Sequence, residues 1–281
     1  MPESLQKAVS VSCMPRSAAI IILCCLASIG IVACSRSEHG SAAIQFELSS
    51  DDPTAQAVEV RLLRFYVHDI ELLEADGTSH RFEIAQRSPW QDGEVALLDL
   101  SETEPDGGNR VVEGSPARNA RELIGVRFTV GVPFARNHAN PLQAAAPLDR
   151  GDMFWSWQTG YKFMRVDLAE AGRDWSFHLG STGCVSASAV RAPASECAQP
   201  NLVRVELRGF DPSREPIRVR LDELVRSMRA TPSGVCTGAY GHEPACEDVF
   251  GKTGLDVVSG RCPTGTCVAQ RLFGVATSSG T

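Results

Sequence analysis

The sequence predicts an all-β protein: an antiparallel β-sandwich or barrel with one or two short helices and a disulfide-rich C-terminal extension. Three observations predict this class. Apolar and polar residues alternate along many short segments, as they do in strands with one buried face. Glycine, proline, aspartate and asparagine separate most of these segments. Residues 44–281, about 240 in number, are enough for one large all-β domain or two small ones, and they contain no internal repeat.

The first 33 residues are expected to be a bacterial lipoprotein signal sequence. The apolar run over residues 18–32 is shorter than the roughly 20 residues of a spanning helix. It ends in Ile31-Val32-Ala33-Cys34, which has the pattern of a lipobox, so Cys34 would carry acyl chains and residues 34–43 would form the lipid anchor and tether. Ser35 favours a periplasm-facing or cell-surface position on the outer membrane. A conventional signal peptide and a plain membrane anchor are the alternatives.

The periodicity then assigns the elements in order. Residues 44–48 (IQFEL) alternate cleanly, and the long run 58–74 ends at the turn Asp76-Gly77. Residues 221–229 (LDELVRSMR) carry apolar side chains at helical spacing, and 247–255 is a second short helical segment. The segments predicted to be strands are 44–48, 58–74, 80–84, 94–100, 123–132, 153–158, 161–168, 175–180, 202–210 and 216–221.

Cysteine usage agrees with export. The chain has ten cysteines, and removing Cys13, Cys24, Cys25 and Cys34 leaves 10 − 4 = 6. Six cysteines allow fifteen connectivities, and short loops favour the sequential pairing. Half of a zinc site around Cys262 is the alternative, but it lacks a second close pair, and an oxidising compartment favours disulfides. The expected pairs are Cys184–Cys197, Cys236–Cys246 and Cys262–Cys267.

Charge and motifs exclude several function classes. The formal charge is −7 with acidic and basic residues mixed, and no basic patch carries interleaved aromatics, so nucleic acid is not expected as a partner. The segment Gly180-Ser181-Thr182-Gly183-Cys184 is similar to a nucleophile elbow only superficially, because a strand–turn–helix context is missing. The chain is therefore expected not to be an enzyme, and a hydrolase is the weakest alternative.

Three of the six histidines lie on or beside predicted strands: His68, His138 and His178. Neutral imidazole is the commonest protein ligand for metals, so these three are the candidate ligands. Each one alone is more often a structural histidine, and spacing along the chain cannot show that they converge. His39, His80 and His242 are expected in the tether, at the surface and in a loop.

Two of the four tryptophans, Trp155 and Trp157, are one residue apart in MFWSWQ. In a strand they would point to the same face. An aromatic ladder in the core is the simplest explanation of the pair. An unmodified indole nitrogen only donates hydrogen bonds and is a poor metal ligand, whereas oxidative ring opening to kynurenine would supply an aryl amine and a ketone.

Five motifs follow one another along the chain: Arg64-Phe-Tyr-Val-His68-Asp69, Asn137-His138-x-Asn-Pro141, Met153-Phe-Trp155-Ser-Trp157-Gln158, Gly160-Tyr-Lys-Phe163-x-Arg165-Val-Asp167 and Phe177-His178-Leu-Gly-Ser-Thr-Gly-Cys184. In this order they resemble the MbnP-like family, the four-cysteine "metallo-mystery pair" proteins. The resemblance covers about residues 44–273, and it also includes Ile217–Leu224, Cys236, Cys246 and Phe250. One departure is that residues 44–58 lack the cysteine pair that the family has near its first strand, while Cys262 and Cys267 are an extra pair.

The resemblance implies an exported copper-binding protein whose partner is a di-haem peroxidase. In such a pair the haem enzyme oxidises a tryptophan of its substrate to kynurenine, and copper then binds. Trp155 or Trp157 is the candidate for this modification, and His178, His68 and His138 are the candidate ligands, in that order. The expected function is copper uptake, storage or delivery, without a haem of its own. A structural or ligand-binding β-sandwich lipoprotein is the alternative.

Overall fold

A computed structural model describes residues 41–102, 107–117, 122–188, 190–231, 234–237 and 244–276. The predicted signal sequence, Cys34 and the tether up to residue 40 lie outside the described residues, as do His39 and His242. Among the helices in the described part of the chain, none has the length and apolar character needed to cross a membrane.

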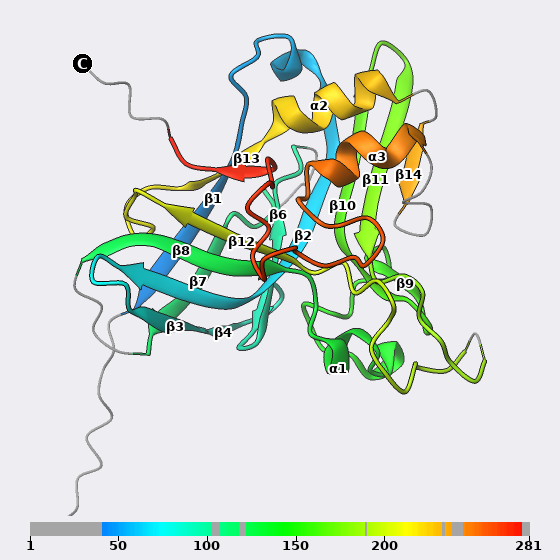
Figure 1. Ribbon diagram of the computed structural model, residues 1–281, viewed down its shortest axis with the longest axis horizontal. Coiled ribbons are helices and arrows are strands. Elements are labelled where there is room, and N and C mark those ends of the chain that lie inside the picture. Colours follow the sequence, from blue (N-terminus) through cyan, green and yellow to red (C-terminus); the bar gives the residue numbers. More distant parts are fainter. Residues whose placement is uncertain are drawn as a thin grey trace, which may run out of the picture. The chain divides into compact units, whose positions relative to one another are not determined.

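Strand β2 (Glu59–Glu74) organises the sheet (Figure 1). Its first half pairs antiparallel with β10 (Gly160–Glu170), and its second half pairs with β8 (Leu123–Val130) and β3 (Ser79–Ile84). Its middle pairs with β6 (Val95–Asp99). A strand of 16 residues is long enough to take different partners at its two ends, so β2 belongs to both halves of the sandwich.

The main path of the sheet runs β14-β11-β10-β2-β3-β7-β1-β13-β15. The helices are α1 (Phe134–Asn137), α2 (Leu221–Ala230) and α3 (Pro244–Gly251), with 3₁₀ turns η1 (Ala55–Ala57) and η2 (Pro141–Gln143). The remaining strands are β1 (Ala42–Ser49), β4 (Gln86–Arg87), β5 (Gln91–Asp92), β7 (Val111–Pro116), β9 (Phe154–Ser156), β11 (Arg173–Gly180), β12 (Val203–Arg208), β13 (Ile217–Arg220), β14 (Val235–Thr237) and β15 (Phe273–Gly274).

The all-β class with short helices is confirmed, but the described residues form three helices where one or two were predicted, and several strands differ from the prediction. The sheet is open, and it is mixed because β1 pairs parallel with β13 and β11 pairs parallel with β14. Such pairs need long crossover connections, which local alternation does not reveal. The strand predicted over 153–158 is only Phe154–Ser156, and the second helix begins earlier, at Pro244, and ends at Gly251.

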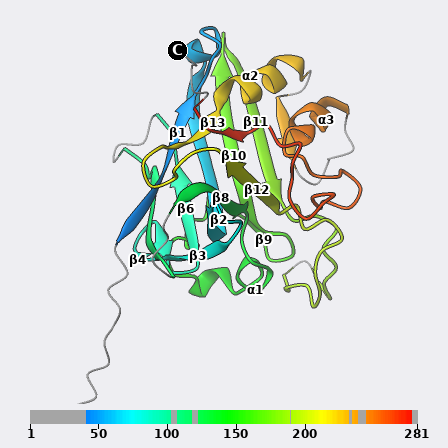
Figure 2. The same ribbon diagram turned by 60° about the vertical axis from the view of Figure 1, so that its left-hand side comes forward.

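Two apolar clusters hold the strands together. In the main core, the rings of Phe46, Phe65, Phe128 and Phe273 meet edge to face with centroids 5.4–5.7 Å apart. Helices α2 and α3 lie beside β10 and β11 in both views (Figures 1 and 2), and Phe250 of α3 packs on the main core. The smaller cluster contains Tyr66, Tyr161 and Phe163. Chain segments around α1 and β9 cover this cluster.

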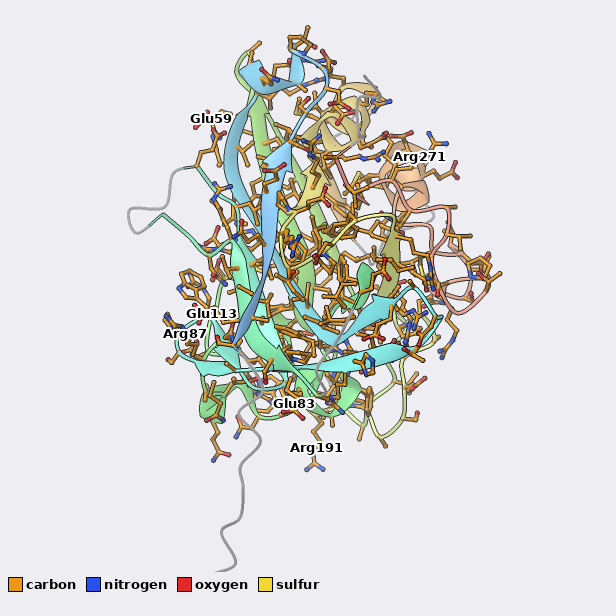
Figure 3. The ribbon with its side chains drawn as sticks, turned by 90° about the vertical axis from the view of Figure 1, so that its left-hand side faces the viewer. Glu59, Glu83, Arg87, Glu113, Arg191 and Arg271 are labelled. Atoms are coloured by element: carbon orange, nitrogen blue, oxygen red, sulfur yellow. A yellow bond between two sulfur atoms is a disulfide. The ribbon has the colours of Figure 1, made fainter. Side chains whose placement is uncertain are left out.

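The predicted disulfide pairing is confirmed in all three bonds: Cys184–Cys197, Cys236–Cys246 and Cys262–Cys267. Cys236–Cys246 joins β14 to α3, which supplies Phe250 to the core, while Cys262–Cys267 closes a short loop within the C-terminal segment. Charged side chains such as Glu59, Arg191 and Arg271 are exposed, and Figure 3 shows them projecting from the periphery.

Candidate metal site

His178 and Asp167 lie on neighbouring strands of the β10–β11 hairpin. The ladder pairs Arg165 with His178 and Asp167 with Ser176. The neighbours of His178 in sequence are buried in the core, so the half-buried imidazole points to the opposite face of the sheet. Its Nε2 lies 3.7 Å from Asp167 Oδ1 and is buried without a hydrogen-bond partner. The carboxylate therefore faces this nitrogen at slightly more than hydrogen-bond distance.

The carboxylate of Asp167 is fixed by its other neighbours. Ser176 Oγ donates to Oδ1 over 2.6 Å, and Arg165 donates to Oδ2 from Nε at 2.9 Å and from Nη2 at 2.8 Å. Burial raises the pKa of Asp167, but the facing His178, the Ser176 hydroxyl and the Arg165 charge outweigh it and hold the pKa at about 2. Asp167 is therefore an immobilised, ionised carboxylate at neutral pH.

Arg165 belongs to an ion-pair network that begins in the interior. Arg64 Nε donates to Asp99 Oδ2 over 2.6 Å, and both side chains are buried. Arg64 Nη1 also donates to Asp152 Oδ2, and the backbone oxygen of Asp152 accepts from Arg165 Nη1 at 3.2 Å and from Lys162 Nζ at 2.8 Å. The network therefore connects β6, β2 and β10 with the segment that leads into β9.

Trp155 packs beside His178. Strand β9 pairs with β10, and this pairing brings the six-membered ring of the indole over Gly180, at the end of β11. The ring centroids of Trp155 and His178 are 6.3 Å apart in an edge-to-face arrangement. The structure thus brings together one of the two tryptophans and the first-ranked candidate histidine, through strand pairing that spacing along the chain does not reveal.

Trp157 occupies a different environment from the predicted one. Strand β9 ends at Ser156, and residues 157–159 form the turn into β10, where Ser156 Oγ contacts Thr159 Oγ1 at 2.7 Å. The alternation that would place both indoles on one strand face therefore does not extend to Trp157. The turn has this form because Gly160 adopts a φ of 80°, which favours glycine.

His138 follows α1 and is held by Asn137 and a disulfide. Its Nε2 lies 3.1 Å from Asn137 Nδ2 and 3.6 Å from Cys197 Sγ. Asn137 Oδ1 accepts from the backbone N–H of Tyr161 at 2.7 Å, which attaches the α1 loop to β10. Burial lowers the pKa of His138, and the backbone of Trp157 partly offsets this effect.

Within the described residues, the one group of three His, Cys, Asp or Glu side chains with ligand atoms mutually within 4.8 Å is His138, Cys184 and Cys197. The two sulfurs of this group are joined in a disulfide, and thiolates rather than disulfide sulfurs bind metals. In the oxidised protein this group is therefore a histidine packed on a disulfide. His178 and His68 do not join His138 in such a group.

His68 lies on β2 and lines a cavity of about 350 Å³ together with Thr129, Leu202 and Arg204. Its Nε2 is buried without a hydrogen-bond partner. Burial lowers the pKa of His68 to about 4. The next residue, Asp69, has a φ of 54° at the point where the β2–β8 register shifts, so the strand bulges beside the histidine.

The pKa of His68 predicts a pH dependence of stability in the metal-free protein. Between about pH 6.5 and pH 4 the unfolded chain binds a proton at His68 that the folded protein does not, so stability falls as the pH is lowered through this window. The loss at pH 5 should be about 2 kcal/mol relative to pH 7.5. Urea unfolding at the two pH values should show this difference, and a His68→Leu variant should lack that part of it.

Gly180 is required by the close approach of Trp155. A Cβ at this position would lie 2.8 Å from the backbone oxygen of Tyr161 and 3.2 Å from two ring carbons of Trp155. A Gly180→Ala variant should therefore lose about 1–3 kcal/mol and displace the indole, which removes the ring-current shift of the His178 imidazole protons in NMR spectra. Gly151→Ala, where a Cβ meets no atom within 4 Å, should change neither quantity.

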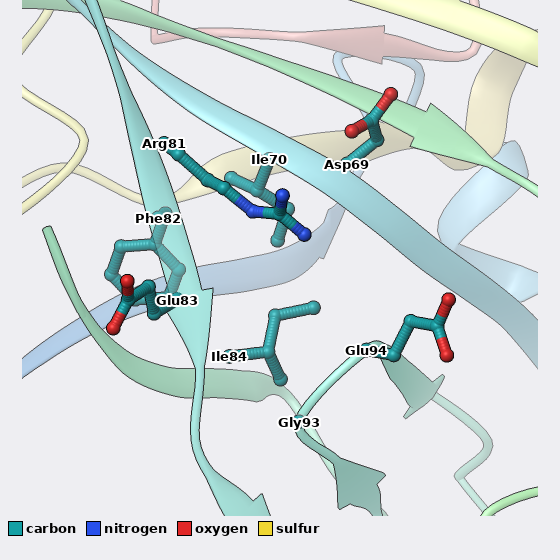
Figure 4. A pocket seen from close by; sticks show the side chains of 8 residues that line it. All are labelled: Asp69, Ile70, Arg81, Phe82, Glu83, Ile84, Gly93 and Glu94. Carbon is teal, nitrogen blue, oxygen red and sulfur yellow. The ribbon is translucent and has the colours of Figure 1, made fainter. Parts of the chain in front are cut away.

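A separate groove of about 360 Å³ shares Asp69 with the cavity at His68. Figure 4 shows it lined by Arg81 and by the carboxylates of Asp69, Glu83 and Glu94, together with apolar residues such as Ile70. Its lining residues include none of the candidate histidines or tryptophans. The candidate metal chemistry is therefore centred on the β9–β11 face and not on this groove.

The sequence did not assign roles to Asp167, Asn137, Asp152 or Ser176. Asn137 and Asp167 lie in motifs that also contain His138 and Arg165, but a motif does not show which side chains meet. Strand pairing in the fold places Ser176 opposite Asp167. Knowledge of the β10–β11 register would have been enough to find this contact.

The fold and this face define a β-sandwich with three disulfides among the described residues and an imidazole beside a tryptophan. The family model MbnP matches residues 37–235, so the chain belongs to the MbnP family. The solved structure of MbnP from Methylosinus trichosporium is similar to it, with a TM-score of 0.71 and 25% sequence identity over 85% of this chain and 99% of that chain. No curated protein matches the chain. The predicted family resemblance is confirmed.

Proposed function

We propose that this protein is an exported, lipid-anchored copper-binding protein whose site is matured by oxidation of Trp155. The oxidant would come from a partner di-haem peroxidase, and the protein would serve copper uptake, storage or delivery. His178 is the principal ligand in this proposal. Membership of the MbnP family supports the class of function. The observation that carries the assignment of residues is the contact between Trp155 and His178.

The donor chemistry of this face fits copper. Imidazole nitrogen is a good ligand for copper, and the ring nitrogens of His178 make no hydrogen bond to the described residues. Before modification the indole of Trp155 offers no lone pair to a metal. After ring opening, the aryl amine and ketone would lie within the same packing site over Gly180, next to the imidazole. This explains why a tryptophan adjacent to a histidine is the better candidate for modification.

Trp157, His138 and His68 have smaller parts in this proposal. Trp157 lies in the turn after β9, and no ring contact joins it to a candidate histidine among the described residues. Nε2 of His138 is engaged by Asn137 and faces the disulfide. His68 lines its own cavity. These two histidines stay predicted ligands, and neither joins His178 in a group of candidate ligands among the described residues.

The test is co-expression of the full chain with a di-haem peroxidase of the partner class, followed by mass spectrometry of the peptide spanning residues 150–165. The wild-type peptide should carry a ring-opened tryptophan, and the protein should retain copper through dialysis. A Trp155→Phe variant should lose the modification, whereas Trp157→Phe, the matched control, should keep it. Modification that persists in Trp155→Phe and disappears in Trp157→Phe would reverse the assignment. An unmodified wild-type peptide in the presence of active partner and peroxide would end the maturation hypothesis.

A further inference from the structure

We infer that Asp167 is a positioning residue that holds His178 in the tautomer protonated at Nε2, so that Nδ1 is the nitrogen presented to a metal. This inference rests on the proposed function for its metal, while the tautomer itself is a property of the metal-free protein. The two nitrogens of an imidazole are distinct, and the group that faces one nitrogen decides which of the two carries the proton and which can bind a metal. The geometry around His178 distinguishes them.

The first argument is accessibility. Nε2 of His178 is buried without a hydrogen-bond partner, and the nearest charged group is Asp167 Oδ1 at 3.7 Å. Nδ1 is not enclosed in this way. An incoming ion would therefore reach Nδ1 without displacing any hydrogen bond, whereas at Nε2 it would have to enter between the imidazole and an ionised carboxylate that is already in place.

The second argument is the fixed position of the carboxylate. Ser176 and Arg165 hold both oxygens of Asp167, and the backbone oxygen of Asp152 holds Arg165 in turn. A negative charge that cannot rotate away from Nε2 favours a proton on that nitrogen, because an N–H dipole aimed at the carboxylate is stabilised and a lone pair aimed at it is repelled. Asp167 thus selects the tautomer by electrostatics.

A carboxylate facing the second imidazole nitrogen, here at 3.7 Å, is related to an arrangement that metal-binding histidines use widely. A ligating imidazole usually donates its other N–H to a carboxylate, which fixes the ring and makes the ligating nitrogen more basic. Here the carboxylate and the imidazole come from adjacent strands of one hairpin, so a rigid element sets their separation. Asp167 would act on copper through His178 and would not touch it.

The decisive measurement is NMR of the metal-free full chain labelled with ¹⁵N-histidine, at a pH where His178 is neutral. The spectrum should show a protonated Nε2 and an unprotonated Nδ1 for His178, assigned by its loss in His178→Gln. In Asp167→Asn the two tautomers should become mixed. In Asp174→Asn, which removes an exposed carboxylate from the same hairpin, the wild-type tautomer should remain. An unprotonated Nε2 in the wild type overturns the inference.

Copper affinity gives a second, independent readout. Asp167→Asn should weaken copper binding by about 10–100-fold, the usual effect of removing the carboxylate partner of a ligand, while Asp174→Asn should not change it. Affinity that is unchanged in Asp167→Asn would show that the carboxylate does not support the ligand. If wild-type protein binds no copper but shows the Nε2–H tautomer that Asp167→Asn mixes, the proposed function fails and the assignment of Asp167 stands.

Discussion

Replacing His178 by alanine is expected to lower the copper affinity of the matured protein by more than about 100-fold, because loss of the supporting carboxylate alone costs about 10–100-fold. Among the ring contacts of the described residues, His178 is the imidazole that meets Trp155. The variant should fold normally, since Nε2 of His178 makes no hydrogen bond and Asp167 keeps its bonds to Ser176 and Arg165. A competition titration with a chromogenic copper chelator measures the effect.

The matched control is His80→Ala. His80 lies on β3, its Nε2 is 3.1 Å from Glu74 Oε1, and it is not one of the candidate ligands. Its removal should leave copper affinity unchanged. Equal losses in both variants would mean that copper binds to scattered histidines and not to one site. Wild-type affinity in His178→Ala would move the search to His138 and His68.

The sequence predicts the long antiparallel strands of this fold well and its short or non-local pairings poorly. Strands β2, β10 and β11 are 16, 11 and 8 residues long, so each gives an apolar segment that is long enough to detect. β11 buries alternate residues from Trp175 to Leu179, whereas β2 and β10 also bury consecutive residues. The sequence pattern does not predict β7, because Gly114 and Pro116 interrupt the alternation of apolar and polar residues. The glycine is nevertheless needed in this strand, since a Cβ at position 114 would lie 2.2 Å from the backbone oxygen of Glu83. Strands of two or three residues, such as β15, have no period to detect.

The candidate site was predicted in its components but not in its assembly. Alternation along MFWSWQ correctly placed Trp155 on a strand, but it could not show that the strand ends at Ser156. The contact between Trp155 and His178 depends on two separate pairings, β9 with β10 and β10 with β11. The importance of Asp167 depends on the same register. Such tertiary contacts leave no trace in residue spacing.

An Arg64→Met substitution is expected to lower the free energy of unfolding by about 3–5 kcal/mol, the typical cost of leaving a buried charge without its partner. Asp99 is fully buried, and its Oδ2 accepts from Arg64 Nε over 2.6 Å. Oδ1 is already used by the backbone N–H and the hydroxyl of Ser101. Methionine fills much of the arginine volume, so the loss reports the ion pair and not a cavity. Urea unfolding at pH 7 measures it.

The double variant Arg64→Met/Asp99→Asn separates the ion pair from the packing around it. Asparagine can still accept from Ser101 but carries no charge to compensate, so the double variant should be more stable than Arg64→Met alone, and the two single losses should not add. Additive losses would show that the two residues act independently.

Arg64 also holds Asp152, which anchors Arg165, so Arg64→Met should additionally loosen Asp167 and shift the NMR signals of the His178 ring. Asp174→Asn, at the exposed end of the hairpin, should leave these signals in place.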